Sequence, residues 1–272
     1  MERRVVVAAA VVVVVSLAGC SVLLGDGGAG PSTATPTSEP TATATPTPGP
    51  AAFDYPDGYG PNGIADVTTA AETHAGTLAG YDGYRVRFDV AVGAGDGTES
   101  RFSYRLSVDQ ADETALEIRE DGVVTRRQYY EDDRLYVNVE TPDGERYNAT
   151  DAPFAPEAFG GREFIDPLFG AVDYGTPERV ETDNGTVYRY RSERVTDPRA
   201  IVPGNVVDEG IRRFDVQLLV HEDGYVRGAR YTVVTEEGTE LQGVAVVDSV
   251  GDERVERPAW YDRAAGADGQ AS

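Results

Sequence analysis

The spacing of apolar residues changes once along the chain, close to Gly83. Before this point, Val67 to Leu78 has apolar residues on one side of a helix, with Asp66 as the N-cap and Gly80 as the stop. After it, Tyr84 to Val92 alternates apolar and polar residues, the period of a β-strand with one buried face. The sequence therefore predicts one helix followed directly by β-structure.

Further alternating runs continue to residue 248 and are separated by Asp-Gly and Asn-Gly pairs, which favour tight hairpin turns. The predicted strands after the first are 102–108, 116–118, 123–130, 135–140, 145–149, 179–181, 187–192, 212–221, 225–235 and 240–248. Two segments interrupt them: 151–174, with a short helix over 162–172 that Pro167 weakens, and 198–208. We expect an α+β fold with one large curved antiparallel sheet, a half-barrel of about 9–11 strands. The N-terminal helix and the short helical insertions would cover one face and leave an apolar trough.

The first twenty residues have the layout of an export signal. Two arginines, Arg3 and Arg4, precede the apolar run Val5 to Val15, which is too short to cross about 30 Å of hydrocarbon. Residues 17–20, Leu-Ala-Gly-Cys, resemble the lipobox of prokaryotic lipoproteins, which implies cleavage before Cys20 and a lipid on its sulfur. The alternative is an incidental thiol in an uncleaved anchor. The arginine pair also resembles a twin-arginine signal, so the export route stays open between that pathway and Sec.

These features divide the chain into four parts. Residues 1–19 form a lipoprotein signal peptide, and residues 20–52 form a disordered tether rich in Thr, Pro and Ala that begins with the lipidated cysteine. Residues 53–262 form a single half-barrel domain, and residues 263–272 form a disordered tail.

Charge and composition exclude some classes of function and indicate the salt concentration in which the protein works. The net charge is −23, and all 24 basic residues are arginine. Such a charge excludes nucleic acid as a partner, because phosphates would be repelled. It is also typical of proteins adapted to molar salt, in which charge repulsion is screened, although an ordinary acidic protein is the alternative. The single cysteine excludes an internal disulfide framework.

The overall layout resembles the uncharacterised lipoproteins of halophilic archaea. The resemblance is carried by the lipobox, the Thr/Pro tether, Tyr84 to Phe88 after the helix, and the closing Pro258 to Trp260. The architecture is similar to the half-barrels of the lipoprotein carrier LolA and of LppX, which implies acyl chains held inside the concave face. The residues that we expect to line this trough are Phe88, Phe102, Tyr104, Phe164, Leu168, Phe169, Phe214 and Leu218.

Motifs for catalysis and metal binding are weak. His74 and His221 are the only imidazoles, so a three-histidine zinc site is excluded. We expect His74 to be a surface or partly buried helix residue rather than a ligand. The acidic loop from Asp54 to Asp66 lacks EF-hand spacing and is more typical of solvated carboxylates than of a Ca²⁺ site. We expect no metal, no cofactor and no enzymatic activity.

Two sequons, at Asn148 and Asn184, would accept N-glycans if the chain is exported. Together these observations predict a lipid-anchored protein on the extracellular side of the cell membrane, held there through Cys20. It would bind or carry a lipid or another hydrophobic ligand in the concave face. The alternative function is a protein–protein interaction module of the envelope with a filled interior.

Overall fold

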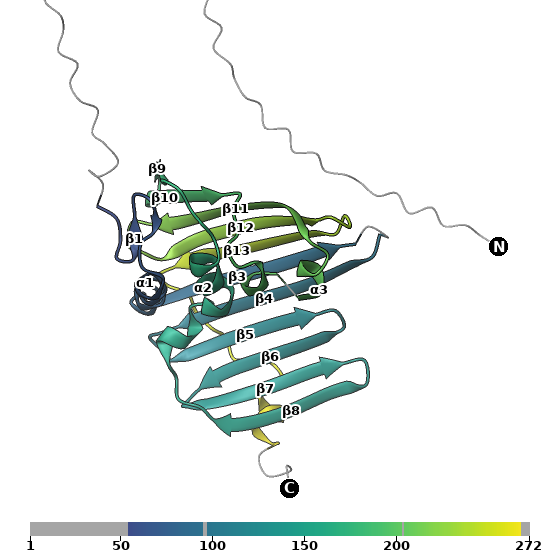
Figure 1. The fold of residues 1–272 in the computed structure, drawn as a ribbon. Coiled ribbons are helices and arrows are strands. Elements are labelled where there is room, and N and C mark those ends of the chain that lie inside the picture. The colour runs from purple at the N-terminus through teal and green to yellow at the C-terminus, as the bar shows by residue number, and fades with distance from the viewer. Residues whose placement is uncertain (1–53, 95–96, 203, 268–272) are drawn as a thin grey trace, which may run out of the picture. The chain divides into compact units, whose positions relative to one another are not determined.

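A computed structural model describes residues 54–94, 97–202 and 204–267. Most of this part forms one antiparallel sheet with the strand order β8-β7-β6-β5-β4-β3-β13-β12-β11-β10-β9 (Figure 1). The strands are β3 (Gly83–Gly93), β4 (Glu99–Asp109), β5 (Thr114–Asp121), β6 (Val124–Glu131), β7 (Arg134–Thr141), β8 (Gly144–Asp151), β9 (Glu178–Thr182), β10 (Gly185–Ser192), β11 (Ile211–His221), β12 (Val226–Thr235) and β13 (Glu240–Val250). Two further strands, β1 (Tyr59–Gly60) and β2 (Gly63–Ile64), pair only with each other.

The sheet consists of two runs of hairpins that meet at one long seam. Strands β3 to β8 follow each other outward, and strands β9 to β13 return until β13 pairs with β3. At this seam Phe88 lies opposite Ala245 and Val90 lies opposite Gly243. Because β8 and β9 remain edge strands, the sheet does not close, and the expected α+β half-barrel with 11 strands is confirmed.

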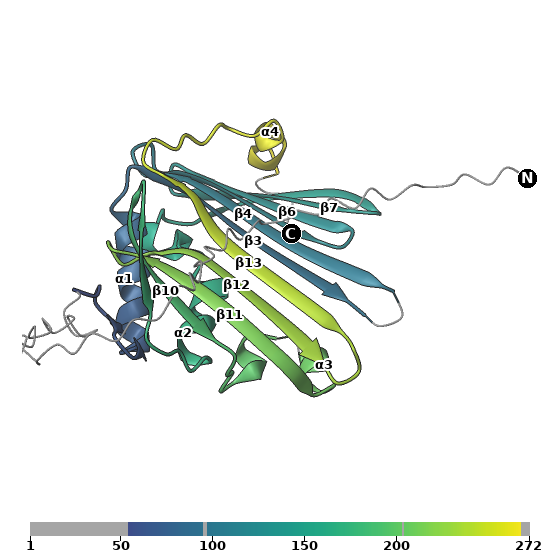
Figure 2. The same ribbon diagram turned by 90° about the horizontal axis from the view of Figure 1, so that it is seen from above.

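Short helices cover one face of this sheet, which we call the inner face. The described residues form the helices α1 (Val67–Ala79), η2 (Pro156–Phe159), α2 (Arg162–Gly170), η3 (Pro198–Ala200), α3 (Gly204–Val207) and α4 (Tyr261–Ala265), of which α4 does not belong to this cover. Figures 1 and 2 show α1, α2 and α3 on the inner face and α4 on the opposite, outer face. Helix α1 begins as expected, because the Asp66 carboxylate accepts a hydrogen bond of 2.8 Å from the Thr69 amide.

The core lies between the inner face and these helices. Leu78 of α1, Tyr84 of β3 and Leu218 of β11 are fully buried there. The ring of Tyr231 crosses the neighbouring strand at Gly243, where a Cβ atom would lie 2.2 Å from the ring. Glycine at position 243 therefore makes room for the tyrosine, an arrangement in which an aromatic ring covers a strand glycine.

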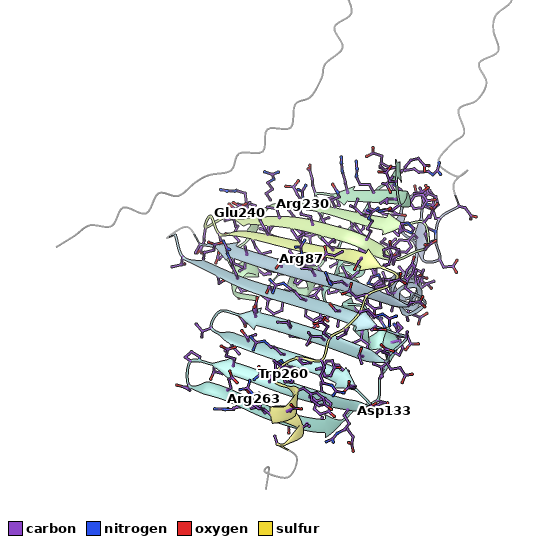
Figure 3. All side chains as sticks on the ribbon, turned by 180° about the vertical axis from the view of Figure 1, so that it is seen from behind. Arg87, Asp133, Arg230, Glu240, Trp260 and Arg263 are labelled. Atoms are coloured by element: carbon purple, nitrogen blue, oxygen red, sulfur yellow. The ribbon has the colours of Figure 1, made fainter. Side chains whose placement is uncertain are left out.

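The C-terminal segment crosses the outer face, which Figure 3 shows from behind. Trp260 packs against Tyr129 and Tyr136 over strands β6 and β7, and only 8% of its surface is exposed. Arg263 of α4 pairs with Glu145 of β8 at 3.0 Å. Helix α4 ends at Ala265, three residues beyond the domain boundary at 262 that the sequence predicts.

Three other expectations need correction. The apolar spacing predicts that Val67 lies on the buried side of α1, but 42% of its surface is exposed. Helix α2 ends at Gly170 rather than at the expected residue 172, and the Ala171 amide caps it by donating a hydrogen bond of 3.0 Å to the Pro167 carbonyl. His74 is buried rather than at the surface, with 1% of its area exposed.

Candidate ligand-binding site

Four aromatic side chains meet on the inner face, and we call them the aromatic cluster. Phe164 of α2 stacks on Phe88 of β3, with ring centroids 4.2 Å apart and planes 19° apart. The Phe164 ring is also 4.8 Å from Tyr104 and 5.8 Å from Phe102, both on β4. The strands present these rings together because Phe88 lies opposite Tyr104 in the ladder, on the same face.

All eight residues predicted to line a trough lie in one hydrophobic core between sheet and helices. Phe102 and Phe164 are partly buried, whereas the other six are buried. Within this core, the Phe164 ring occupies the space above Phe88 and Tyr104. The eight residues therefore share the inner face of the sheet, and their role as a ligand-binding lining stays a prediction.

A charged group borders the aromatic cluster. Arg119 of β5 lies over the Tyr104 ring at 5.2 Å, and its guanidinium pairs with Glu117 at 2.6 Å and with Glu163 of α2 at 2.5 Å. Partial burial lowers the pKa of Arg119, but the hydrogen bonds to both carboxylates outweigh this effect and raise it. Arg119 therefore stays cationic and ties α2 to the sheet.

The start of α2 is held by His74 of α1. Its Nε2 lies 2.9 Å from the Gly160 carbonyl, and its Nδ1 accepts a hydrogen bond of 3.1 Å from the Val226 amide. Nδ1 is thus the acceptor and Nε2 the donor, which requires the neutral ring. Complete burial lowers the pKa of His74 to about 4, so the ring remains neutral near pH 7.

The same inner face continues beyond the cluster onto strands β5 to β8. In the strand register, Arg119 of β5 lies opposite Tyr104 of β4 and, on its other side, opposite Arg126 of β6. Val139 of β7 in turn lies between Arg126 and Arg146 of β8. Arg126 and Arg146 are exposed. No local motif marks Arg126 and Arg146 in the sequence, because their common position depends on strand register.

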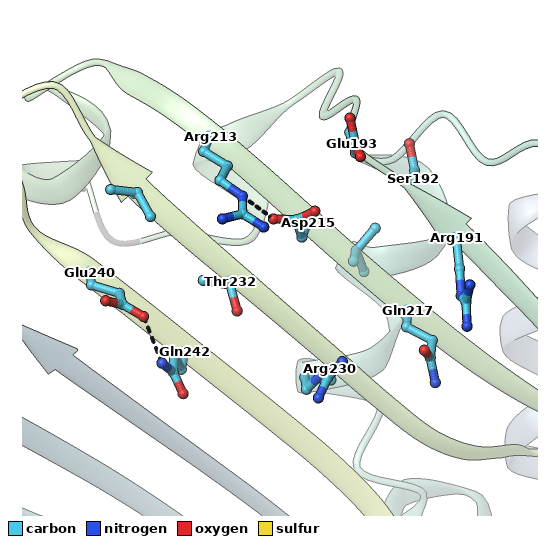
Figure 4. Close-up of a pocket in the computed structure, with 12 residues that line it drawn as sticks. Arg191, Ser192, Glu193, Arg213, Asp215, Gln217, Arg230, Thr232, Glu240 and Gln242 are labelled. Carbon is cyan, nitrogen blue, oxygen red and sulfur yellow. Dashed lines mark hydrogen bonds and ion pairs between the residues drawn. The ribbon is translucent and has the colours of Figure 1, made fainter. Parts of the chain in front are cut away.

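The outer face carries polar hollows. One of about 810 Å³ lies over β10 to β13, with Arg191, Gln217 and Arg230 among its lining residues (Figure 4). Arg213 there pairs with Asp215 at 2.5 Å. A second of about 590 Å³ lies over β13 and β3 to β5. Their charged linings suit water and ions better than hydrocarbon.

The remaining predicted sites lie elsewhere. Cys20 lies outside the described residues. Asn148 is exposed on β8, and Asn184 is exposed in the turn between β9 and β10. Among the described residues, no group of three or more His, Cys, Asp or Glu side chains is arranged to hold a metal ion. No helix in residues 54–94, 97–202 or 204–267 is long and apolar enough to cross a membrane.

Comparisons with known proteins give only distant structural similarity. No protein-family model and no curated protein matches the sequence. A LolA superfamily protein from Nitrosomonas europaea is 11% identical, with 72% of this chain and 96% of that chain covered and a TM-score of 0.26. A domain of an outer membrane lipoprotein-sorting protein from Vibrio parahaemolyticus is 7% identical, with 71% and 95% covered and a TM-score of 0.26. A DUF1329 family protein from Desulfovibrio piger is 8% identical, with 73% and 98% covered and a TM-score of 0.26. At these scores, conclusions about function rest on the residues of this chain.

Proposed function

We propose that this protein is a lipid-anchored, non-enzymatic binding protein on the extracellular side of the cell membrane. It holds a lipid or another hydrophobic ligand between the inner face of the sheet and helix α2. The observation that carries this proposal is the aromatic cluster, in which a single side chain from a short helix, Phe164, fills the space over Phe88 and Tyr104.

The ligand would enter by displacing Phe164. Exposing a fully buried phenylalanine costs about 1.5–3 kcal/mol, which is an upper limit for the partly buried Phe164, and each buried methylene group contributes about 0.8 kcal/mol. An acyl chain that buries roughly four methylene groups therefore offsets the displacement, and a longer chain binds with net stabilisation. Phe164 and Phe102 are only partly buried, so the cluster is already open to solvent at one side.

Lipidation of Cys20 would supply the membrane attachment. Acyl chains contribute about 0.8 kcal/mol per buried CH₂, and two chains give a durable anchor. The Cys20→Ser variant should therefore be released from membranes, and a variant that stays in the membrane fraction would refute the lipid anchor.

Binding and displacement can be measured together in the full chain. The only tryptophan is Trp260, so a Trp260→Phe background allows Phe164→Trp to report on the aromatic cluster alone. Adding palmitate should shift the emission to longer wavelength, since the indole leaves its buried position. Phe164→Ala should bind a fluorescent fatty acid several-fold more tightly than the unmodified protein, because no ring has to be displaced.

Tyr261→Ala is the matched control, because it removes an aromatic ring from the outer face, where Tyr261 lies 4.4 Å from Tyr136. It should leave fatty-acid binding unchanged. If the unmodified protein binds no fatty acid and the emission does not move, the carrier function is wrong. The filled interior would then favour the second candidate, a protein–protein interaction module of the envelope.

A further inference from the structure

One row of the inner face runs from the aromatic cluster to a pair of arginines. Direct cross-strand partners point to the same face, so Tyr104, Arg119, Arg126, Val139 and Arg146 form a continuous row over strands β4 to β8. The apolar end of this row lies under α2, and the basic end lies on the uncovered strands (Figure 1).

The two outer arginines of the row differ from Arg119, which is engaged by Glu117 and Glu163. Among residues 54–94, 97–202 and 204–267, Arg126 donates only to the Gln128 side-chain oxygen, at 2.8 Å. Within the described part of the chain, Arg146 has no hydrogen bond or ion pair, and neither arginine has a carboxylate partner.

This arrangement is unusual in a chain with 47 acidic and 24 basic residues. Arg119 lies directly opposite Arg126, but its charge is compensated by Glu117 and Glu163, whereas no carboxylate of the described residues pairs with Arg126 or Arg146. Asp121 also lies on the inner face of β5, but it makes no ion pair with Arg126. An anion between Arg126 and Arg146 would compensate these two charges.

The spacing suits one anionic group. Arg126 and Arg146 flank Val139 and are two strands apart, which places their backbones roughly 10 Å apart. Long side chains on either side of a valine can converge above it. The planar guanidinium groups then present paired donors to carboxylate or phosphate oxygens.

We propose that Arg126 and Arg146 bind the anionic head group of an amphiphile whose hydrocarbon chain displaces Phe164. This inference rests on the proposed function and specifies its ligand class. The recognised chemistry is a carboxylate or phosphate group attached to a hydrocarbon chain. A neutral lipid would occupy the aromatic cluster without this additional contact.

The test compares the affinities of the full chain for anionic and neutral ligands at about 2 M KCl. At this salt concentration the Debye length is below roughly 3 Å, so only charges in direct contact still attract each other. Palmitate against hexadecanol tests a carboxylate, and phosphatidic acid against the diacylglycerol with the same chains tests a phosphate. The unmodified protein should prefer the anionic member of at least one pair by roughly tenfold.

The combined variant Arg126→Gln and Arg146→Gln should lose this preference and keep its affinity for the neutral ligand. The matched control is Arg191→Gln with Arg230→Gln, which removes the same charge from the outer-face hollow of Figure 4. This control should retain the preference. All four arginines are exposed, so both variants should remain folded, which circular dichroism verifies.

The outcomes separate the two proposals. If neither neutral nor anionic lipids bind the unmodified protein, the proposed function fails. If lipids bind but show no preference for the anion, or if the preference survives in the Arg126 and Arg146 variant, this inference alone is overturned. Loss of the preference in the outer-face control would also overturn it. A preference confined to the palmitate pair or to the phosphatidic acid pair identifies the source of the head group.

Discussion

His74 shows how one buried side chain couples three segments of the fold. Its two ring nitrogens contact Gly160, which precedes α2, and Val226 at the start of β12. Both contacts need the neutral ring, and a proton on Nδ1 would turn the acceptor for Val226 into a second donor. The position of α2, and with it that of Phe164, therefore depends on the protonation state of His74.

A pH dependence of stability follows. Burial lowers the pKa of His74 from 6.5 to about 4, so the unfolded chain binds this proton more readily than the fold does. The His74 contribution to the free energy of unfolding is therefore complete above pH 6.5. It is lost as the pH falls towards 4, by up to about 3 kcal/mol. Urea unfolding between pH 4 and 7 should show a steeper decline for the unmodified protein than for His74→Gln. Parallel curves would contradict this assignment.

Replacing either of two glycines by alanine should change the free energy of unfolding, but in opposite directions. Gly161, directly before α2, has φ of +66°, and a Cβ there would lie 3.3 Å from the Val86 side chain. Gly161→Ala should therefore lower the free energy of unfolding by roughly 1–2 kcal/mol. Gly76 lies within α1 with no atom within 4 Å of an added Cβ, so Gly76→Ala should raise it by roughly 0.5–1 kcal/mol. Thermal unfolding of both variants measures the difference, and a shift in the same direction for both would refute the argument.

At the scale of elements, the C-terminal segment acts as a strap over the outer face of β6 to β8. Trp260 lies among Tyr129 and Tyr136, and Arg257 pairs with Glu131 at 2.7 Å. The apolar ring burial dominates the stabilisation, since the exposed ion pair contributes little.

Removing the ring of Trp260 should therefore detach this strap. Trp260→Ala should lower the free energy of unfolding by roughly 3–5 kcal/mol, as for other large buried aromatic residues. Limited proteolysis should cleave the segment after residue 250 much faster than in the unmodified protein. Val123→Ala is the control, because 74% of Val123 is exposed and its loss should change neither measurement. Unchanged proteolysis of Trp260→Ala would show that the strap is held by other contacts.

The sequence predicts elements of this fold better than it predicts contacts between them. The strands could be located because each alternates along one buried face and ends at a turn such as Asp183-Asn184-Gly185. Helix α4 could not, since five residues from Tyr261 to Ala265 are too short to show a helical period. The packing of Phe164 onto Phe88 and Tyr104 could not be predicted either, because it depends on how α2 docks on the sheet. The alignment of Arg126 with Arg146 depends on the register of three strands, which local patterns do not specify.

At the scale of the whole chain, charge is the dominant property. Many arginines of the described residues pair with a carboxylate, as Arg254 does with Asp109 at 3.1 Å. Even so, the net charge of −23 leaves a large excess of carboxylates, whose mutual repulsion opposes the compact state. On the outer face Asp89 of β3, Glu120 of β5 and Asp248 of β13 each pair with an arginine, so the repulsion arises from the carboxylates that exceed the 24 basic residues.

Stability should therefore depend steeply on salt. The Debye length is roughly 3 Å at 1 M salt and roughly 30 Å at 0.01 M, so desalting restores repulsion between carboxylates across the sheet. We expect circular dichroism to show loss of β-structure, and the thermal midpoint to fall, between about 2 M KCl and about 20 mM KCl. Glycerol at the same osmolality is the control, because it excludes an effect of hydration alone and provides no screening. An unchanged spectrum and midpoint in low salt would mean that the excess charge is tolerated without screening. The protein would then be an ordinary acidic protein rather than one adapted to molar salt.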